Sequence, residues 1–267
     1  MIGIFDSGIG GLTVVKAIRR VLPAYQLMYL GDTARTPYGN RSQEKIYEFT
    51  VQAVDYLFKQ GCGLVIVACN TASAEALRKL QQEWLPIHYP DRRVLGVIRP
   101  VVEVAVSQSR YGRLGVLGTR ATVNSGAYER ELRALDPKLK IWQAAAPLLV
   151  PLIEEGWLKR PETIKIARLY LRELKTKKID TLILGCTHYP MLHKKFQSIC
   201  GKNIKVLDVA TIVAEKLKDY LNRHPETEQR LVKGTDHRFL VTDITDIFAK
   251  TASVWLGEDI RLEKVNL

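Results

Sequence analysis

The chain has 267 residues, of which 46% are hydrophobic and 25% charged, with a formal net charge of +12. This balance is typical of a globular protein, and the length suffices for one large core or two smaller ones. No apolar run approaches the roughly 18 residues that a membrane-spanning helix needs, so we expect no membrane contact. The first residues lack the regions of a signal peptide, and the four cysteines lack a CxxC spacing. Reduced thiols in the cytoplasm are therefore expected.

In chain order, strand-like and helix-like segments alternate, which predicts an α/β fold with parallel sheets. The expected strands cover residues 1–5, 26–30, 63–68, 94–98, 114–118, 139–143, 180–185, 204–208 and 237–242. The expected helices cover residues 12–22, 46–57, 72–80, 161–174, 191–199 and 212–221, with another from about 125. Asp243 is expected to cap a last helix whose Ile247, Phe248 and Trp255 point inward.

Two halves of the chain repeat one plan. Gly115 follows Gly3 by 112 residues in a similar strand–loop–helix context, and Cys186 follows Cys69 by 117 residues. Similar offsets indicate an internal duplication. We therefore predict two similar doubly wound parallel-sheet domains, related by a pseudo-two-fold axis, with an active site between them. Residues 1–93 plus 209–267 would form the first domain, and residues 94–208 the second.

Each of two short apolar runs, at residues 63–69 and 180–186, ends in a cysteine followed by polar residues. Such a run is typical of a strand buried on both faces, which places Cys69 and Cys186 at the carboxyl ends of their strands. Ligands of open α/β sheets bind at that end. The alternative is that both thiols are small core residues, as free cysteines often are. The polar neighbours favour a site that uses both.

Between the first strand and helix lies the glycine-rich segment Asp6-Ser7-Gly8-Ile9-Gly10-Gly11. It matches neither a dinucleotide fingerprint nor a P-loop. Its glycines suit either an anion cradle or a plain tight turn, and Asp6 at the strand tip favours a functional role. The later loop at residues 31–40 is long and rich in turn-forming residues, which favours a binding loop.

Four motifs, in the same order and spacing, resemble those of bacterial glutamate racemase, in the cofactor-independent Asp/Glu racemase family. They are Asp6-Ser7-Gly8-x-Gly10-Gly11, Pro37-Tyr38-Gly39, Cys69-Asn70-Thr71 and Gly185-Cys186-Thr187-His188-Tyr189-Pro190. The chain departs from the family pattern at Arg99, Ala146 and Asp243. These departures bear on the expected loop geometry and oligomer contacts, and none of them affects the two thiols.

The resemblance implies an isomerase that converts L-glutamate to D-glutamate for peptidoglycan synthesis, without cofactor or metal. It implies that Cys69 and Cys186 are catalytic, with Asp6 and His188 assisting them. It also implies that the amino acid is held by eight residues: Asp6, Ser7, Tyr38, Gly39, Asn70, Thr71, Thr187 and His188. We expect glutamate as the small-molecule partner and a homodimer as the assembly.

Racemisation removes a proton from one face of Cα and returns a proton to the other, so a pair of acid/base groups suits it. A thiol serves once its neighbours help the thiolate to form. Asp6 is the candidate that assists one of the two thiols. His188, which lies two residues past Cys186, is the candidate that assists the other. Side chains of Ser7, Asn70, Thr71 and Thr187 would stabilise the charge that develops on the substrate.

Other functions stay open. A relative acting on another substrate, such as an aspartate racemase or a maleate isomerase-like enzyme, would use the same thiols. The net charge of +12 allows contact with nucleic acid, although the densest basic stretches, at 159–178 and 193–205, alternate with apolar residues as solvated helix faces do. A metal site of Cys186, His188, His193 and Cys200 matches no common zinc spacing.

Overall fold

A computed structural model describes residues 1–267 and contains two parallel β-sheets. The six-stranded sheet has the order β10-β9-β2-β1-β3-β4 and the four-stranded sheet the order β6-β5-β7-β8. The strands are β1 (Ile2–Asp6), β2 (Leu27–Gly31), β3 (Leu64–Val67), β4 (Arg93–Gly96), β5 (Arg113–Gly118), β6 (Lys140–Ala145), β7 (Thr181–Gly185), β8 (Lys205–Val206), β9 (Arg238–Val241) and β10 (Leu262–Lys264). The predicted α/β class with parallel sheets is confirmed.

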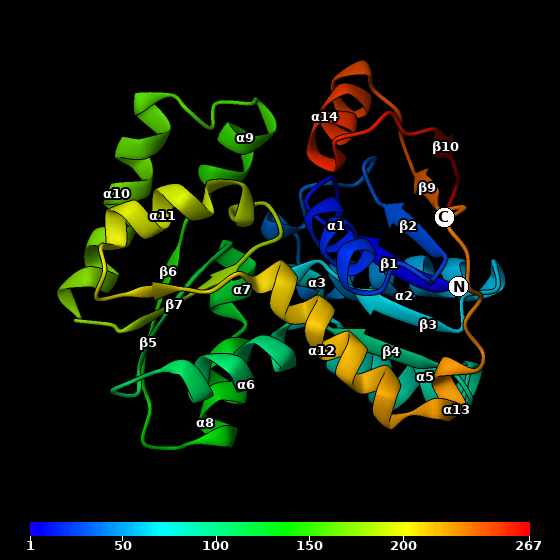
Figure 1. Ribbon diagram of the computed structural model, residues 1–267, viewed down its shortest axis with the longest axis horizontal. Coiled ribbons are helices and arrows are strands. Elements are labelled where there is room, and N and C mark those ends of the chain that lie inside the picture. Colours follow the sequence, from blue (N-terminus) through cyan, green and yellow to red (C-terminus); the bar gives the residue numbers. More distant parts are fainter.

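Helices pack around both sheets (Figure 1). The longer ones are α1 (Leu12–Val21), α2 (Gln43–Lys59), α6 (Ile98–Gln108), α8 (Ala127–Leu135), α10 (Pro161–Thr176), α11 (His193–Cys200), α12 (Val209–Arg223) and α14 (Asp246–Leu256). The short ones are α3 (Asn70–Glu75), α4 (Leu77–Lys79), α5 (Leu85–His88), α7 (Arg120–Asn124), α9 (Leu149–Glu154) and α13 (Pro225–Glu228). One π-helical turn lies at Leu80–Trp84, and 3₁₀ turns lie at Tyr38–Asn40 and Tyr189–Leu192.

The two sheets share one strand order. Within the larger sheet, β2-β1-β3-β4 run side by side, and the smaller sheet repeats this as β6-β5-β7-β8. Every strand pair is parallel, so the carboxyl ends of the strands gather at one edge of each sheet. The segments after β1 and β3 therefore have counterparts after β5 and β7.

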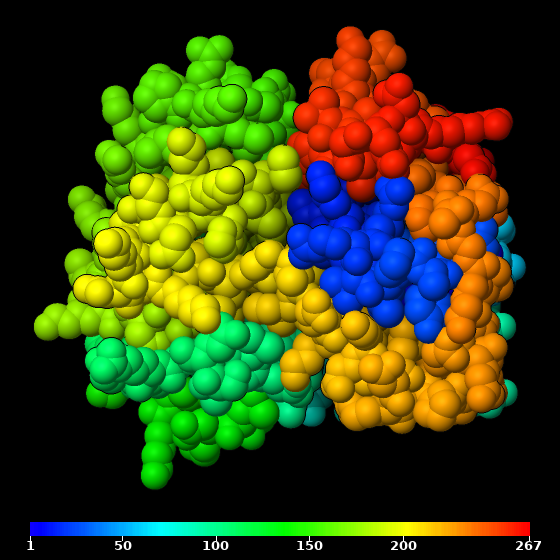
Figure 2. All heavy atoms as spheres, viewed as in Figure 1, coloured from blue at the N-terminus to red at the C-terminus, as the bar shows by residue number.

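Both chain ends belong to the larger sheet, because β1 and β10 are two of its strands. The smaller sheet consists of β5 to β8 alone, and Figure 2 shows this middle part of the chain, coloured green to yellow, as one mass beside the rest. The chain leaves the larger sheet after β4 and returns through α12, which packs against α1 and α6. The domain boundaries at residues 93/94 and 208/209 stay a prediction.

The core joins the two sheets. The larger of two apolar clusters has 56 buried residues and includes Ile4 of β1 as well as Val116 of β5 and Leu182 of β7. The smaller cluster covers the opposite face of the six-stranded sheet, where Phe5 and Val65 point. Successive side chains of a strand point to opposite faces of the sheet, so Ile4 and Phe5 pack into different clusters. One face of the larger sheet is thus continuous with the core of the smaller.

Several details of the last third differ from expectation. Thr245, not Asp243, caps α14, because its hydroxyl accepts a hydrogen bond from the backbone N–H of Phe248. Asp243 instead pairs with Lys264 at 3.1 Å. Ile247 is 69% exposed rather than inward-facing, whereas Trp255 is buried as predicted.

The apolar run at residues 94–98 also ends sooner than expected. The strand stops at Gly96, and Ile98 begins helix α6. Pro100 is tolerated in the first turn of that helix, where backbone N–H groups have no intrahelical partner.

None of the helices combines the length and the apolar character that are needed to cross a bilayer.

Candidate active site

The two predicted thiols occupy equivalent places in the two sheets and line one cavity of about 270 Å³. Cys69 follows β3 and Cys186 follows β7, the strands that hold the same position in the common order. Both are nearly buried, with 5% and 6% of their surface exposed. A small molecule in this cavity therefore has a sulfur atom from each sheet beside it.

Nine of the ten residues predicted for the site line this cavity. They are Ser7, Tyr38, Gly39, Cys69, Asn70, Thr71, Cys186, Thr187 and His188. The tenth, Asp6, lies directly behind it. The rest of the lining comprises Thr36, Pro37, Asn40, Thr119, Arg120, Pro147, Val150, Pro151 and Glu154. The first three lie in the loop at residues 31–40, which the sequence predicts to be a binding loop. The sequence did not predict the other six, which come from the segments after β5 and β6 and from helices α7 and α9.

Cys69 caps helix α3, since its sulfur accepts a hydrogen bond from the backbone N–H of Ala72 at 3.5 Å. The Ser7 hydroxyl lies 3.3 Å from the same sulfur. Burial raises the pKa of the Cys69 thiol to about 12, and the charge of Asp6 acts in the same direction, while the hydrogen bonds from Ser7 and Ala72 oppose it. At neutral pH the Cys69 side chain is therefore a neutral thiol that can donate a proton.

Cys186 belongs to a chain of three side chains. Its sulfur lies 3.8 Å from Nδ1 of His188, and Nε2 of that ring lies 2.9 Å from Oε1 of Glu154. Burial alone lowers the pKa of the His188 ring, but the hydrogen bonds to Cys186 and Glu154 outweigh it and raise that pKa to about 10. The rings of His188 and Trp255 lie nearly perpendicular to each other, with centroids 5.7 Å apart. A protonated imidazole beside the sulfur stabilises negative charge there.

Asp6 is fully buried at the end of β1. One of its carboxylate oxygens accepts a hydrogen bond from the Gly8 backbone N–H at 3.0 Å, and the other accepts one from the Thr187 hydroxyl at 3.2 Å. Burial raises the pKa of the Asp6 carboxyl, although the charge of His188 and these hydrogen bonds oppose the rise. Asp6 thus links the loop after β1 to the loop after β7, behind both thiols.

The glycine-rich segment allows these two loops to approach each other closely. A Cβ atom at Gly10 would lie 2.2 Å from Oγ1 of Thr187 and 2.6 Å from Nδ1 of His188. At Gly11, a Cβ atom would lie 2.5 Å from Cβ of Asp6. Only glycine fits at such distances. Close packing around the site is the role that the structure assigns to these two glycines.

The loop after β2 is held from behind by Asp32, which is fully buried. Its carboxylate accepts hydrogen bonds from the Tyr38 hydroxyl at 2.5 Å, from Nε of Arg35 at 2.6 Å and from the Thr242 hydroxyl at 2.9 Å. The Tyr38 hydroxyl is therefore directed at Asp32 and away from the cavity. Asp32 fixes the loop that carries Tyr38 and Gly39.

Three threonine hydroxyls meet beside the cavity. Oγ1 of Thr71 lies 3.0 Å from that of Thr119 and 3.3 Å from that of Thr122, and the last two lie 2.9 Å apart. Thr119 follows Ser7 by 112 residues, the same offset that separates Gly115 from Gly3. This correspondence with a predicted site residue could have identified Thr119 from the sequence. Nearby, Oδ1 of Asn70 accepts a hydrogen bond from Tyr128 at 2.6 Å. The Asn70 amide N–H groups are thereby left for a ligand.

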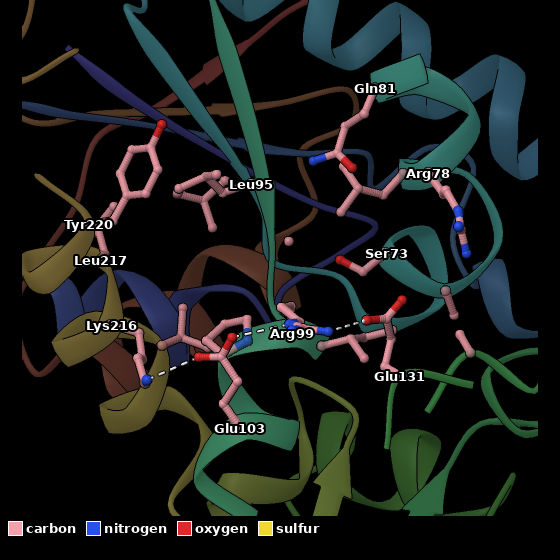
Figure 3. A pocket seen from close by; sticks show the side chains of 18 of the residues that line it. Ser73, Arg78, Gln81, Leu95, Arg99, Glu103, Glu131, Lys216, Leu217 and Tyr220 are labelled. Carbon is pink, nitrogen blue, oxygen red and sulfur yellow. Dashed lines mark hydrogen bonds and ion pairs between the residues drawn. The ribbon is translucent and has the colours of Figure 1, made fainter. Parts of the chain in front are cut away.

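A larger cavity, of about 510 Å³, lies elsewhere and contains none of the predicted site residues. Figure 3 shows its charged lining, in which Arg99 contacts both Glu103 and Glu131 while Lys216 contacts Glu103. It contains no thiol, and its two carboxylates, Glu103 and Glu131, are both held in ion pairs, so size does not identify the chemical site here.

The alternative metal site is not assembled. His193 uses Nε2 to contact the backbone oxygen of Val206 at 3.0 Å, and Cys200 is buried at the end of α11. No group of three or more His, Cys, Asp or Glu side chains is placed to hold a metal ion.

The chain is similar to known glutamate racemases. The glutamate racemase of Chlorobaculum parvum is 42% identical over 97% of this chain and 93% of that protein. The glutamate racemase of Aquifex aeolicus is 45% identical over 97% of this chain and 95% of that protein.

Solved structures agree with these relatives. Glutamate racemase isoform RacE1 from Bacillus anthracis matches with a TM-score of 0.92 at 35% identity, over 100% of this chain and 97% of that one. Glutamate racemase from Francisella tularensis, in complex with D-glutamate, matches with a TM-score of 0.88 at 33% identity, over 99% and 97%. An Asp/Glu/Hydantoin racemase family model covers residues 2–217. These matches confirm the resemblance inferred from the four motifs, and the chain belongs to the Asp/Glu/Hydantoin racemase family.

Proposed function

We propose that this chain racemises glutamate through the thiols of Cys69 and Cys186, without a cofactor. The observation that carries the proposal is the placement of one thiol from each sheet at the wall of a single small cavity. The glutamate racemases that share up to 45% identity over nearly the whole chain support glutamate as the substrate. The family is one of isomerases, so the chain is an enzyme of that class.

Each direction of the reaction uses both thiols. With L-glutamate, the Cys186 thiolate removes the proton from Cα, and the Cys69 thiol then donates its proton to the opposite face, which yields D-glutamate. With D-glutamate, the roles are exchanged. The assignment of each thiol to an enantiomer rests on the family resemblance. That the two thiols approach opposite faces of Cα is inferred from their positions on separate sheets.

The surroundings of the thiols favour this division of labour. Cys69 has a pKa raised to about 12 and is ready as an acid. The His188 ring, with a pKa raised to about 10 by its hydrogen bonds to Cys186 and Glu154, is protonated at neutral pH and lies beside the Cys186 sulfur. To accept D-glutamate, Cys69 needs the positive ammonium group of the bound amino acid to favour its thiolate.

Removal of the Cα proton places negative charge on the substrate carboxylate, and fixed donors must stabilise that charge. Candidate donors are the Asn70 amide and the hydroxyls of Ser7, Thr71 and Thr187, all of which line the cavity. Asp6, behind the cavity, is the natural partner of the substrate ammonium group together with the hydroxyl of Thr187. Tyr38 and Gly39 would close the side of the cavity that faces the loop after β2.

The product D-glutamate would supply peptidoglycan synthesis in the cytoplasm, and the enzyme would act as a homodimer; both proposals rest on the family resemblance. The substrate is tested by incubating dialysed protein with each enantiomer of glutamate and of aspartate and separating the products on a chiral column. Turnover of both glutamate enantiomers, without added cofactor and after chelator treatment, is the expected result. If only aspartate is turned over, aspartate and not glutamate is the substrate. If chelator abolishes the activity and added metal restores it, the cofactor-free mechanism is refuted.

A further inference from the structure

Positive charge is concentrated in one stretch of the chain, which belongs to the part with the smaller sheet. Between residues 159 and 205 there are twelve lysines and arginines but three carboxylates, so this stretch carries nine of the twelve net positive charges. All twelve cations are exposed, whereas one of the three carboxylates, Asp180, is buried. Protein surfaces usually intersperse charges of both signs, so this surface is unusual.

None of these twelve side chains forms an ion pair with a carboxylate. Other exposed helices of the chain do pair their arginines with a carboxylate one turn away. Examples are Arg133 with Glu129 on α8 and Arg223 with Asp219 on α12. Such pairs are common on helix faces that only meet solvent. The charges between residues 159 and 205 are therefore not neutralised within the chain and are available to an external anion.

Four of the cations form a stripe along α10, and they are Lys165, Arg168, Arg172 and Lys175. Residues spaced by three or four positions lie above one another on one side of a helix. The stripe therefore presents about one cation per helical turn and extends over about 15 Å, at about 1.5 Å of rise per residue. The side of α10 that packs inward is buried, so the stripe faces outward.

Helix α11 extends this basic surface. Nζ of Lys175 donates a hydrogen bond to the backbone oxygen of Ile199 in α11, and the two helices lie side by side (Figure 1). The first turn of α11 adds the exposed Lys194 and Lys195. We call the α10 stripe together with these two lysines the basic face. None of its residues lines the thiol cavity, so a ligand on this face leaves the cavity unoccupied.

An extended anion with regularly repeated charges fits such a face. Duplex DNA carries one phosphate charge per about 1.7 Å of its axis, and lysines and arginines bind it by displacing its counterions. Surfaces that bind membranes add exposed apolar side chains to their cations, but Leu169 is the one large apolar side chain exposed between residues 159 and 205. Single-stranded nucleic acid stacks its bases on aromatic rings, and no aromatic side chain of this stretch is exposed.

We propose that the basic face binds the phosphate backbone of duplex DNA without regard to base sequence. Contacts of lysine and arginine with phosphates hold the duplex in place but carry no sequence information. This inference goes beyond racemisation and does not depend on it, because the basic face and the thiol cavity share no residue. The binding is electrostatic, so each phosphate that is neutralised contributes about −0.9 to the slope of log K against log salt concentration.

The test measures fluorescence anisotropy of a labelled duplex of about 20 base pairs, titrated with the protein between about 50 and 200 mM salt. The wild-type protein should bind with a Kd on the order of 10⁻⁶ M at the lower salt concentration, and more weakly as salt rises. The combined substitutions Lys165→Ala, Arg168→Ala and Arg172→Ala should weaken binding by at least about tenfold at low salt. They should also make the salt slope shallower by about two to three.

The matched control combines Lys218→Ala, Lys250→Ala and Arg261→Ala. These three cations are exposed, form no ion pair and lie on α12, on α14 and directly before β10. The control removes the same charge at other places, and screening confines each exposed charge to about 10 Å at about 0.1 M salt. It should therefore bind DNA within about threefold of wild type. Both triple variants should racemise glutamate as the wild type does.

Several results would overturn the inference. They are the absence of duplex binding at about 50 mM salt, equal DNA affinity of the two triple variants, and tighter binding of a single strand than of the duplex. Binding to vesicles of phosphatidylglycerol and phosphatidylcholine in place of the duplex would also overturn it, since the basic face would then belong to a membrane-binding protein. A wild-type protein that binds the duplex but does not racemise glutamate would refute the proposed function and support this inference.

Discussion

Nδ1 of His188 lies 3.8 Å from Sγ of Cys186, while the other nitrogen of the same ring faces Glu154. One imidazole thus joins a carboxylate at the cavity rim to a thiol inside it. The ring is nearly buried, and a buried ring held between two groups that favour its cation keeps its proton to an unusually high pH.

The pKa of His188 should appear in the pH dependence of stability. Because the pKa rises from its usual 6.5 to about 10 on folding, the protonated ring stabilises the fold fully below about pH 6.5, and this stabilisation is lost as the pH rises through about 10. Urea unfolding between pH 6 and 10.5 should show a smaller decline for His188→Asn than for wild type. The exposed His88→Asn serves as the control. Parallel pH curves for all three proteins would contradict the assignment.

Glu154→Gln should move the alkaline limb of the rate profile. The substitution keeps the shape of the side chain but removes the charge that holds the proton on Nε2 of His188, so the pKa of the ring falls. The decline of kcat/KM at high pH should then begin at lower pH than in wild type. Glu155→Gln, at the neighbouring exposed position, should leave the profile unchanged. Identical profiles for both variants would show that Glu154 does not act through the ring.

If the proposed mechanism holds, serine at position 69 or at position 186 should abolish most of the activity. A hydroxyl has nearly the size of a thiol but a far higher pKa, so proton transfer fails. We expect Cys69→Ser and Cys186→Ser each to lower kcat by about 10² to 10⁴ or more in both directions. Cys62→Ser and Cys200→Ser are the matched controls, since both thiols are buried outside the cavity and should cost little activity. Near-normal turnover by one of the first pair would remove that residue from the mechanism.

The isotope content of the first product reports on the two faces. In D₂O, the donating thiol carries deuterium from the solvent, while the accepting thiol holds the abstracted proton. A reaction stopped early should therefore yield product with deuterium at Cα and leave the remaining substrate largely unlabelled, from either enantiomer. The measurement is mass spectrometry of the two separated enantiomers. Substantial retention of the original proton in the product would indicate one base rather than two.

Asp32→Asn should loosen the loop that carries Tyr38. The substitution leaves Arg35 without its carboxylate, and the new amide group offers hydrogens where Tyr38 and Arg35 already donate. We expect a loss of about 1–3 kcal/mol in the free energy of unfolding, with a raised KM for glutamate. Asp243→Asn, which breaks a surface ion pair, should cost less than about 1 kcal/mol and leave KM unchanged. Equal losses in the two variants would deny Asp32 this role.

Much of the site could be predicted because its residues follow apolar strands directly. Cys69 and Cys186 stand two and one residues past β3 and β7, where the end of a buried strand is visible in the sequence. Glu154 and Arg120 could not be found that way. Glu154 reaches His188 from a short helix 34 positions earlier, and only the folded chain brings the two together.

The fold shows the same division between local and tertiary information. Helices with a regular apolar face, such as α1 and α12, were predicted close to their observed ends. The strand near residue 96 was extended too far, because an apolar run does not reveal where a strand gives way to a helix. Ile247 was placed inside for its apolar character alone, although α14 buries Trp255 and leaves Ile247 at the surface.

The common strand order of the two sheets has a consequence for the reaction itself. The substrate and the product of a racemase are mirror images at a single carbon atom, with equal free energies in solution. An enzyme that serves both must offer each face of that carbon a group of comparable strength. Two strand–loop units in one common order, each followed by a cysteine that lines the cavity, would meet this requirement.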